Sequence, residues 1–221
     1  MGAQKMNTES RKEQIAQAAL DLIGSHGLQA LSIANVAERV GLVPSGIYRH
    51  FKSKDDLLSA TLDLIGKRLL SNVESVRRET PDALERLRVL LMREIRLLLE
   101  NQAIPHVIFS ESIFTDSVDR KDRVRAVITG YFQEVEKIVR EGQREGRLRA
   151  DVDPLTVVLM FKGMVLPAIV LWKVTRGNVD LVRQAEAEWE LFSAAVSDPC
   201  EGLGKSRGMA KVNETRWRKP G

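Results

Sequence analysis

Residues Ser32 to Phe51 read SIANVAERVGLVPSGIYRHF. Ser32 is a favoured N-cap residue, and the apolar spacing after it predicts a short helix that runs to Val40 and stops at Gly41. Pro44 stands where a first-turn proline belongs and opens a still shorter helix. Two short helices joined by a tight turn that contains a glycine predict a helix-turn-helix unit over residues 32–51.

The pattern on both sides of this unit is helical as well. Apolar residues recur at three- and four-residue steps, and no alternating run of the strand type stands out. We therefore predict an all-α fold of about nine helices: three short ones, a long connector helix and five more. Outside residues 32–51 the expected helices are Thr8–Ser25, Lys54 to about Arg78, from Thr80-Pro81 to Leu98, a short one from Pro105, Ser117–Glu145, Pro154 to about Thr175, and one that Asn178 caps and that ends near Val196.

The net charge of +4 arises at the end of the 221-residue chain. Six basic residues and one acid follow from Lys205 onward, so residues 199–221 are expected to form a basic, disordered tail. The start of the chain lacks the apolar core of a signal peptide. The apolar run Leu155–Trp172 is interrupted by Lys162 and Pro167 and is shorter than the ~20 residues that a membrane span needs. We expect a cytoplasmic protein that does not contact a membrane.

Residues that could carry catalysis or bind a metal are sparse. Cys200 is the only cysteine, which excludes an internal disulfide and a thiolate metal cage. His26, His50 and His106 lie in separate segments without metal-ligand spacing in one helix, although folding could still bring them together. We expect no enzyme activity, no cofactor and no bound metal.

The helix-turn-helix unit points instead to DNA. In such a unit the second helix enters the major groove, about 12 Å wide, while the first braces the DNA backbone. Ile47 and Phe51 are expected to face inward. The second helix then presents Ser45, Gly46, Tyr48, Arg49 and His50 to the outside. Its small residues allow close approach to base edges, and its longer polar ones can donate to phosphates.

The surrounding residues strengthen this interpretation. From about Arg11 to Leu62 the chain carries Ala19, Leu22 and Gly27, then Ser32-Ile33-x-x-Val36-Ala37, then Gly41, then Ile47-Tyr48-x-His50-Phe51-x-Ser53-Lys54-x-x-Leu57. This order resembles the TetR/AcrR family of transcriptional regulators over about 55 residues. The resemblance implies a ligand-responsive, dimeric repressor that a small apolar effector releases from a palindromic operator. The alternative is an effector-independent architectural DNA-binding protein with the same fold.

The resemblance also implies a set of DNA-contacting residues. They are Ser32, Ala34, Asn35, Val43, Pro44, Ser45, Gly46, Tyr48, Arg49, His50 and Lys54. Within this set Pro44, Ser45 and Gly46 face base edges, whereas Tyr48, His50 and Lys54 reach phosphates. Many relatives have Ser or Thr at the position of Val43, so this chain lacks side-chain capping of its recognition helix.

Three segments follow from this organisation. Residues 1–53 are the expected DNA-binding domain, residues 54–198 a helical ligand-binding and dimerisation domain, and residues 199–221 the tail. The helix Leu155–Trp172 is apolar nearly all round, so it must be covered on several sides, and a second subunit is the economical cover. The family resemblance implies a homodimer through the last two helices, and we expect the stripe of the last helix that includes Val182 and Phe192 to lie in that interface.

An effector site is expected in the second domain. Methionine and aromatic side chains make adaptable apolar walls, and His106 and Lys162 are polar groups on the same segments. The candidate lining residues are His106, Phe109, Phe114, Met160, Phe161, Met164 and Trp172. Ordinary core or dimer packing is the alternative for each of them. A wall of this kind favours an apolar or aromatic effector.

Overall fold

The computed structural model describes residues 7–101, 103–108 and 118–198, with the side chains of residues 105, 106 and 108 excepted. The all-α prediction is confirmed, because the described residues form helices and contain no strand. The helices are α1 Thr8–His26, a 3-10 turn Leu28–Ala30, α2 Ile33–Arg39, α3 Pro44–Tyr48, α4 Lys54–Glu79, α5 Ala83–Glu100, α6 Ala103–Ile108, α8 Val118–Arg144, α9 Pro154–Val174 and α10 Leu181–Val196. The predicted tail and Cys200 lie outside the described residues.

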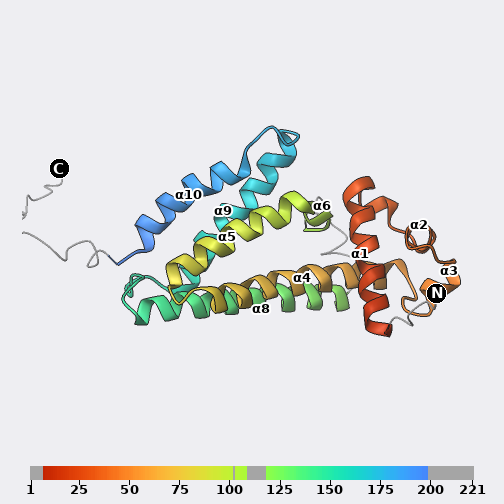
Figure 1. Cartoon of the computed structure of the whole chain (residues 1–221), viewed down its shortest axis with the longest axis horizontal. Coiled ribbons are helices and arrows are strands. Elements are labelled where there is room, and N and C mark those ends of the chain that lie inside the picture. The colour runs from red at the N-terminus through yellow and green to blue at the C-terminus, as the bar shows by residue number, and fades with distance from the viewer. Residues whose placement is uncertain (1–6, 102, 109–117, 199–221) are drawn as a thin grey trace, which may run out of the picture.

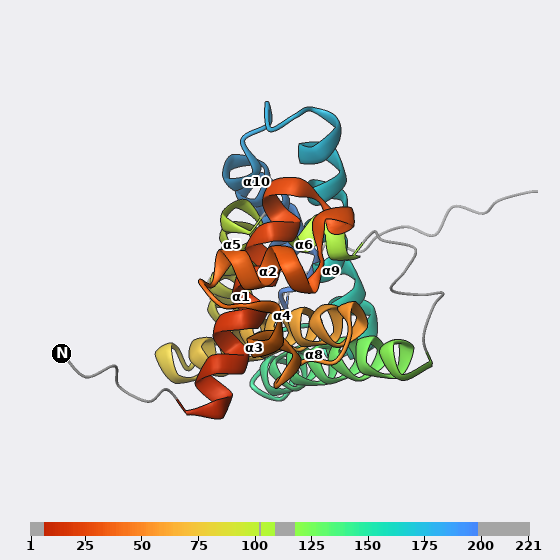
Figure 2. The ribbon, with the colours of Figure 1, turned by 90° about the vertical axis from the view of Figure 1, so that its right-hand side faces the viewer.

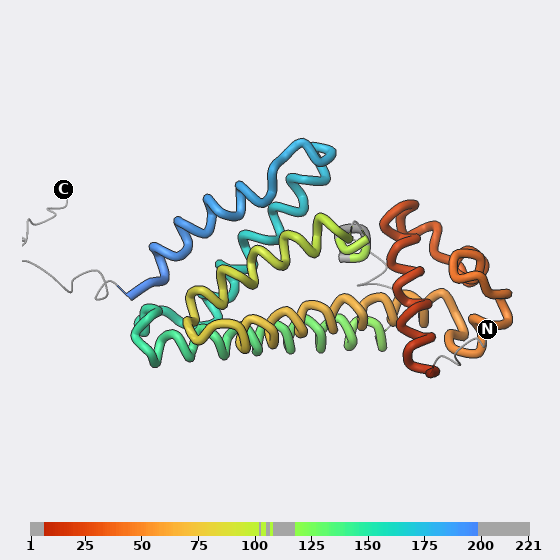
Figure 3. Tube along the Cα trace, in the orientation of Figure 1, coloured from red at the N-terminus to blue at the C-terminus, as the bar shows by residue number. Residues whose placement is uncertain are grey.

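The molecule is elongated, with a small head at one end (Figure 1). Helices α1, α2 and α3 form this head, and α4 runs from it along the whole body beside α8. Helix α5 packs on α4 and α8, and α9 and α10 form the outer part of the body. The tube in Figure 3 shows that α4 passes without interruption from the head into the body. The head is therefore attached to a rigid element and not to a loop.

A compact apolar core holds the head together. Ile15, Val36, Ile47 and Leu57 are each fully buried, and they come from α1, α2, α3 and α4 in turn. Each helix therefore contributes one face of its apolar stripe to the same core. The position of α3 is fixed by this shared packing.

Residues visible in the sequence explain where helix α4 begins and how closely it packs against α8. The Ser53 hydroxyl accepts a hydrogen bond from the Asp56 N–H at 3.1 Å, and acidic residues occupy the first turn, where the helix dipole favours them. Further along, a Cβ on Gly66 would lie 2.8 Å from the methyl groups of Val127. The glycine therefore allows α4 and α8 to approach closely.

Three predicted helix starts are wrong in detail. The cap of α5 is Asp82 and not the Thr80-Pro81 pair, because the Asp82 carboxylate accepts from the Glu85 N–H at 2.8 Å. The cap of α10 is Asp180 and not Asn178, since it accepts from two backbone N–H groups, at 3.1 and 3.0 Å. Helix α6 starts two residues before Pro105.

The outer helices place their apolar residues differently from the prediction. Helix α9 has 21 residues and is long and apolar enough to cross a membrane by length and composition, so the expectation that this apolar run is too short is wrong; 39% of its most apolar window is buried inside the protein. On α10, Phe192 is 5% exposed and packs edge-on against Phe161 with ring centroids 6.1 Å apart. The stripe that includes Phe192 therefore faces the body's own core. The expectation that this stripe meets a second subunit is wrong for Phe192.

Candidate nucleic-acid interface

The turn between α2 and α3 has the geometry that a helix-turn-helix unit needs. Gly41 has a φ of +68°, a backbone conformation that glycine adopts without strain. The Leu42 N–H donates to the Ala37 carbonyl at 2.8 Å, which folds the chain back on α2. Both helices lie at the end of the molecule that faces the viewer in Figure 2. Helix α3 is shorter than predicted and ends at Tyr48, while His50 lies in the turn that follows.

Helix α3 separates its residues cleanly by exposure. Ile47 is fully buried and Phe51 is 6% exposed, whereas the Val43 and Tyr48 side chains are 66% and 55% exposed. Pro44, Ser45 and Arg49 are exposed too, and Gly46 is half-buried. Val43 makes no side-chain cap hydrogen bond, as the sequence predicts. Val43, Pro44, Ser45, Tyr48 and Arg49 are therefore open to solvent at the head, whereas His50 is half-buried and its Nδ1 is buried.

The three predicted DNA-contacting residues at the start of α2 differ in their hydrogen bonds. The Ser32 hydroxyl accepts from the Asn35 N–H at 3.1 Å, and the Asn35 amide donates to the Ala30 carbonyl at 2.8 Å. Both polar groups therefore hold the start of α2. Ala34 is exposed and brings only a methyl group to the surface.

Exposed basic residues follow the recognition helix in the chain. Lys54 is exposed on the first residue of α4, where the sequence prediction expects a phosphate contact. Lys52 is exposed as well, and its backbone N–H donates to the Asp56 carboxylate at 2.8 Å. Sequence reasoning missed Lys52, although its place between His50 and Lys54 could have indicated it. Arg49, Lys52 and Lys54 thus put three exposed basic side chains within six residues of the chain, directly after the recognition helix.

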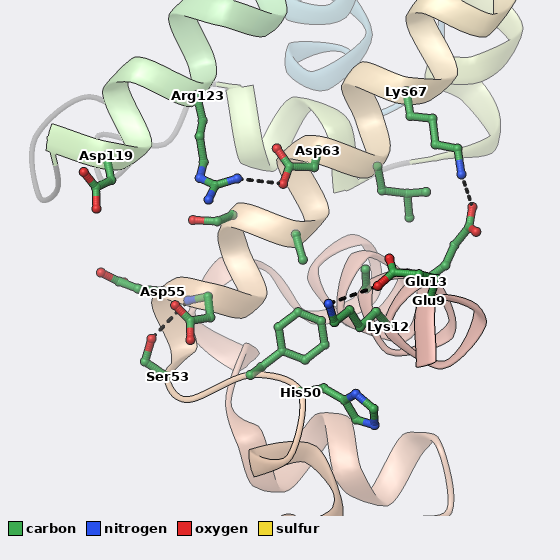
Figure 4. A pocket seen from close by; sticks show the side chains of 16 residues that line it. Glu9, Lys12, Glu13, His50, Ser53, Asp55, Asp63, Lys67, Asp119 and Arg123 are labelled. Atoms are coloured by element: carbon green, nitrogen blue, oxygen red, sulfur yellow. Dashed lines mark hydrogen bonds and ion pairs between the residues drawn. The ribbon is translucent and has the colours of Figure 1, made fainter. Parts of the chain in front are cut away.

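A polar cleft of about 730 Å³ lies where the head meets the body (Figure 4). His50 and Ser53 line it on the head side, and Asp119 and Arg123 of α8 line it on the body side. Three ion pairs border it: Lys12 with Glu9 at 3.2 Å, Lys67 with Glu13 at 3.2 Å, and Arg123 with Asp63 at 3.0 Å. The cleft is thus a charged seam between α1, α4 and α8. Sequence reasoning missed it because the residues come from distant parts of the chain.

A buried arginine joins α8 to the start of α4. The Arg120 side chain is 2% exposed, and its guanidinium lies 2.7 Å from the carboxylate of Asp55. Asp55 is in the first turn of α4, close to Lys54. A movement of α8 would therefore act on the first turn of α4, where the head is attached.

The predicted effector residues do not form one group. Phe161 and Met164 are buried in the core, whereas Met160 is 46% exposed on the other side of α9. Trp172 is half-buried beside a cavity of only about 10 Å³. His106 lies on α6, but its side chain, Phe109 and Phe114 lie outside what the structure describes.

The body does contain a buried polar cluster formed by Glu94, Tyr131 and Lys162, from α5, α8 and α9. The Glu94 carboxylate is 2% exposed, lies 2.5 Å from the Lys162 ammonium, and accepts a hydrogen bond from the Tyr131 hydroxyl. The same ammonium lies 4.6 Å from the centre of the Tyr131 ring. Burial, and then the negative charge of Glu94, raises the pKa of Tyr131 well above its usual value. Lys162 stood out in the sequence, but its two partners did not.

Among the described residues, no group of three or more His, Cys, Asp or Glu side chains is placed to hold a metal ion. A helix-turn-helix head carried by a long helix on a larger helical body defines a class of protein, the DNA-binding transcriptional regulators.

Comparison with known families makes this more specific. Residues 15–61 match the family described as bacterial regulatory proteins, tetR family, and residues 65–195 match the family described as YsiA-like protein, C-terminal region. The chain belongs to the TetR family of transcriptional regulators. The predicted resemblance is confirmed.

Individual relatives agree with this assignment. The nucleoid occlusion factor SlmA of Edwardsiella ictaluri is 28% identical over 149 residues, which are 66% of this chain and 73% of the relative. Among solved structures, the fatty acid degradation regulator FadR of Bacillus halodurans has a TM-score of 0.72 at 20% identity and covers 86% of this chain and 96% of its own. FadR of Bacillus subtilis, solved with stearoyl-CoA, has a TM-score of 0.71 at 20% identity and covers 82% and 97%. At this identity the two structures show the fold.

Proposed function

We propose that the chain is a dimeric repressor that binds a palindromic operator through residues 32–51 and is released by a small apolar effector. The observation that carries the proposal is the division of α3 into a buried side and an exposed side at the tip of the head. Helix α4 then joins this tip to a body with an apolar interior. One element therefore connects the surface that would read DNA to the part that would hold a ligand.

The domain limits belong to the same proposal. Residues 1–53 would bind DNA, and residues 54–198 would bind the effector and a second subunit. The phosphate contacts would come from Tyr48, His50 and Lys54, and base reading from the start of α3. We further propose that the protein is cytoplasmic and has no catalytic activity, since its family regulates transcription.

Exposed apolar residues support a dimer through α9 and α10. Along α9 they are Leu155, Leu159, Met160, Leu166, Val170, Leu171 and Val174, and on α10 the residue is Leu191, which is 76% exposed. An apolar surface of this extent on one pair of helices is a surface for a partner. Two subunits would place two recognition helices on one duplex.

The proposed effector would enter the body near the buried side of α9. Phe161 and Met164 supply apolar surface there, and Lys162 with Glu94 supplies the polar end. The fold likeness to Bacillus subtilis FadR, solved with stearoyl-CoA, makes long-chain fatty acids, whose chains are apolar, the first molecules to screen, with their CoA esters as the comparison.

The experiment has two stages. Duplexes are first selected from random DNA with the full-length protein, and the selected operator is then used to screen free fatty acids, acyl-CoA esters and aromatic compounds for release. We expect a palindromic consensus, and at least one compound that lowers operator affinity tenfold or more. Selection of no consensus would refute operator binding.

A second candidate function rests on the relatives named SlmA. Their description is nucleoid occlusion factor, and their similarity covers 66% of this chain. This description gives weak support to the alternative of an effector-independent architectural DNA-binding protein. This alternative gains if the selected operator is bound but no compound in the screen releases it.

A further inference from the structure

The exposed apolar side chains of the head are concentrated on its recognition helix. Among the described residues of the head, 7–53, the large hydrophobic side chains that are exposed are Val43, at 66%, and Tyr48, at 55%. Tyr48 has a hydroxyl group that can meet a phosphate, but Val43 is apolar throughout. Single exposed apolar residues are common on proteins. Val43, however, is the N-cap residue of α3, where Ser, Thr, Asp or Asn would stabilise the helix better.

The residues next to Val43 offer little hydrogen bonding to a base. Pro44 has no N–H group and is exposed. Ser45 is exposed and brings one short hydroxyl group, and Gly46 has no side chain. Long side chains that form paired hydrogen bonds with G or A, such as Arg, Asn or Gln, are missing from positions 43–46. The tip of α3 is therefore suited to shape and apolar contact.

The major groove has one apolar feature on its base edges, the C5-methyl group of thymine. We infer that Val43 contacts a thymine methyl group in each half-site and makes that position of the operator specific for T·A. The inference rests on the proposed operator binding by residues 32–51. It adds a specificity-determining residue and names the chemical group that the residue reads. At the N-cap position of α3, Val43 thus gives up side-chain capping of the helix and supplies an apolar contact to a base.

The loss of binding affinity on removal of this contact can be estimated. Removing one buried methyl group from an apolar contact weakens binding by about fourfold, and removing one from each half-site by about fifteenfold. Phosphate contacts are unaffected, because deoxyuridine differs from thymidine only in this methyl group. The effect is therefore specific to one position of the half-site.

The experiment replaces each dT of the selected operator, one symmetrical pair at a time, with dU. Full-length wild-type protein and Val43→Ser are titrated with each duplex by fluorescence anisotropy. Serine is a favoured N-cap residue, so Val43→Ser is expected to keep or raise the melting temperature. Val118→Ser, which alters a 74%-exposed valine on α8, is the matched control.

We expect one symmetrical pair of dU substitutions to weaken wild type and Val118→Ser by about fifteenfold and Val43→Ser by less than twofold. The inference is overturned if no pair weakens wild type, or if the same loss persists in Val43→Ser. In both cases specific operator binding by wild type would stand. If selection yields no operator at all, the proposed function fails and this inference fails with it.

Discussion

Glu94 is a carboxylate held inside an apolar body. Its side chain is 2% exposed, and its charge is met by the Lys162 ammonium and the Tyr131 hydroxyl. A buried ion pair adds little stability over an apolar pair, but removal of one partner leaves an uncompensated charge. The cluster therefore makes α5, α8 and α9 interdependent.

Substitution of Lys162 tests this interdependence. Lys162→Met should lower the free energy of unfolding by about 3–5 kcal/mol, because it removes the cation that compensates the buried Glu94 carboxyl group. The double variant Glu94→Gln, Lys162→Met should lose less than the single one. Urea denaturation at pH 7 measures both, with Lys173→Met, an exposed lysine on the same helix, as the control. A loss for Lys162→Met no larger than that for Lys173→Met would contradict the assignment.

Asp82 links the start of α5 to Arg147. Burial acts to raise the pKa of Asp82, but hydrogen bonds from the Glu85 N–H and from Arg147 outweigh it and lower that pKa. A carboxyl group whose pKa is lowered by folding stabilises the folded state at pH values above its pKa in the unfolded chain, which is about 4. This stabilisation is lost as the pH falls through the pKa of the group in the folded state.

Asp82→Asn isolates the charge, since asparagine is an equally good N-cap residue. At pH 7 the variant should be less stable by up to about 1 kcal/mol, because the pair with Arg147 is partly exposed. The difference from wild type should shrink as the pH is lowered below about 4. Thermal melts between pH 3 and 7 measure it, and a difference that grows toward acid would show that the sign is wrong.

At the scale of elements, the apolar side chains of α10 are divided between a side that packs on the core and a side that is open to solvent. Ala185, Trp189 and Phe192 are buried, and Leu191 is 76% exposed. The sequence shows an amphipathic stripe but not whether that stripe packs within the chain or against a second copy. Helix α9 is apolar on most sides, so its periodicity could not assign its faces either.

The proposed dimer should therefore depend on Leu191 and not on Phe192. Leu191→Glu places a charge in the interface, which should weaken association by about 3–5 kcal/mol per protomer. We expect a folded monomer by circular dichroism and sedimentation at micromolar concentration. Ile128→Glu, on the exposed side of α8, is the control and should stay dimeric. Sedimentation of Leu191→Glu as a dimer would place the interface elsewhere.

At the scale of the whole molecule, the head and the body share α4. The sequence predicts its start at Ser53, because the N-cap and acidic first turn are local signals, and it predicts the recognition helix from Gly41 and Pro44. It does not predict the Asp55 to Arg120 ion pair or the cleft beside it, because these join residues far apart in the chain. Local signals thus locate the DNA-facing elements, and long-range packing decides how they are coupled.

The account's central claim is sequence-specific DNA binding through the exposed side of α3. The most direct test is an anisotropy titration of wild type with the selected operator and with a shuffled duplex of the same composition, at about 150 mM salt. We predict at least a roughly thousandfold preference for the operator. The triple variant Tyr48→Ala, His50→Ala, Lys54→Ala should weaken binding to both duplexes, because phosphate contacts carry no base information. Equal affinity of wild type for the two duplexes would contradict the account.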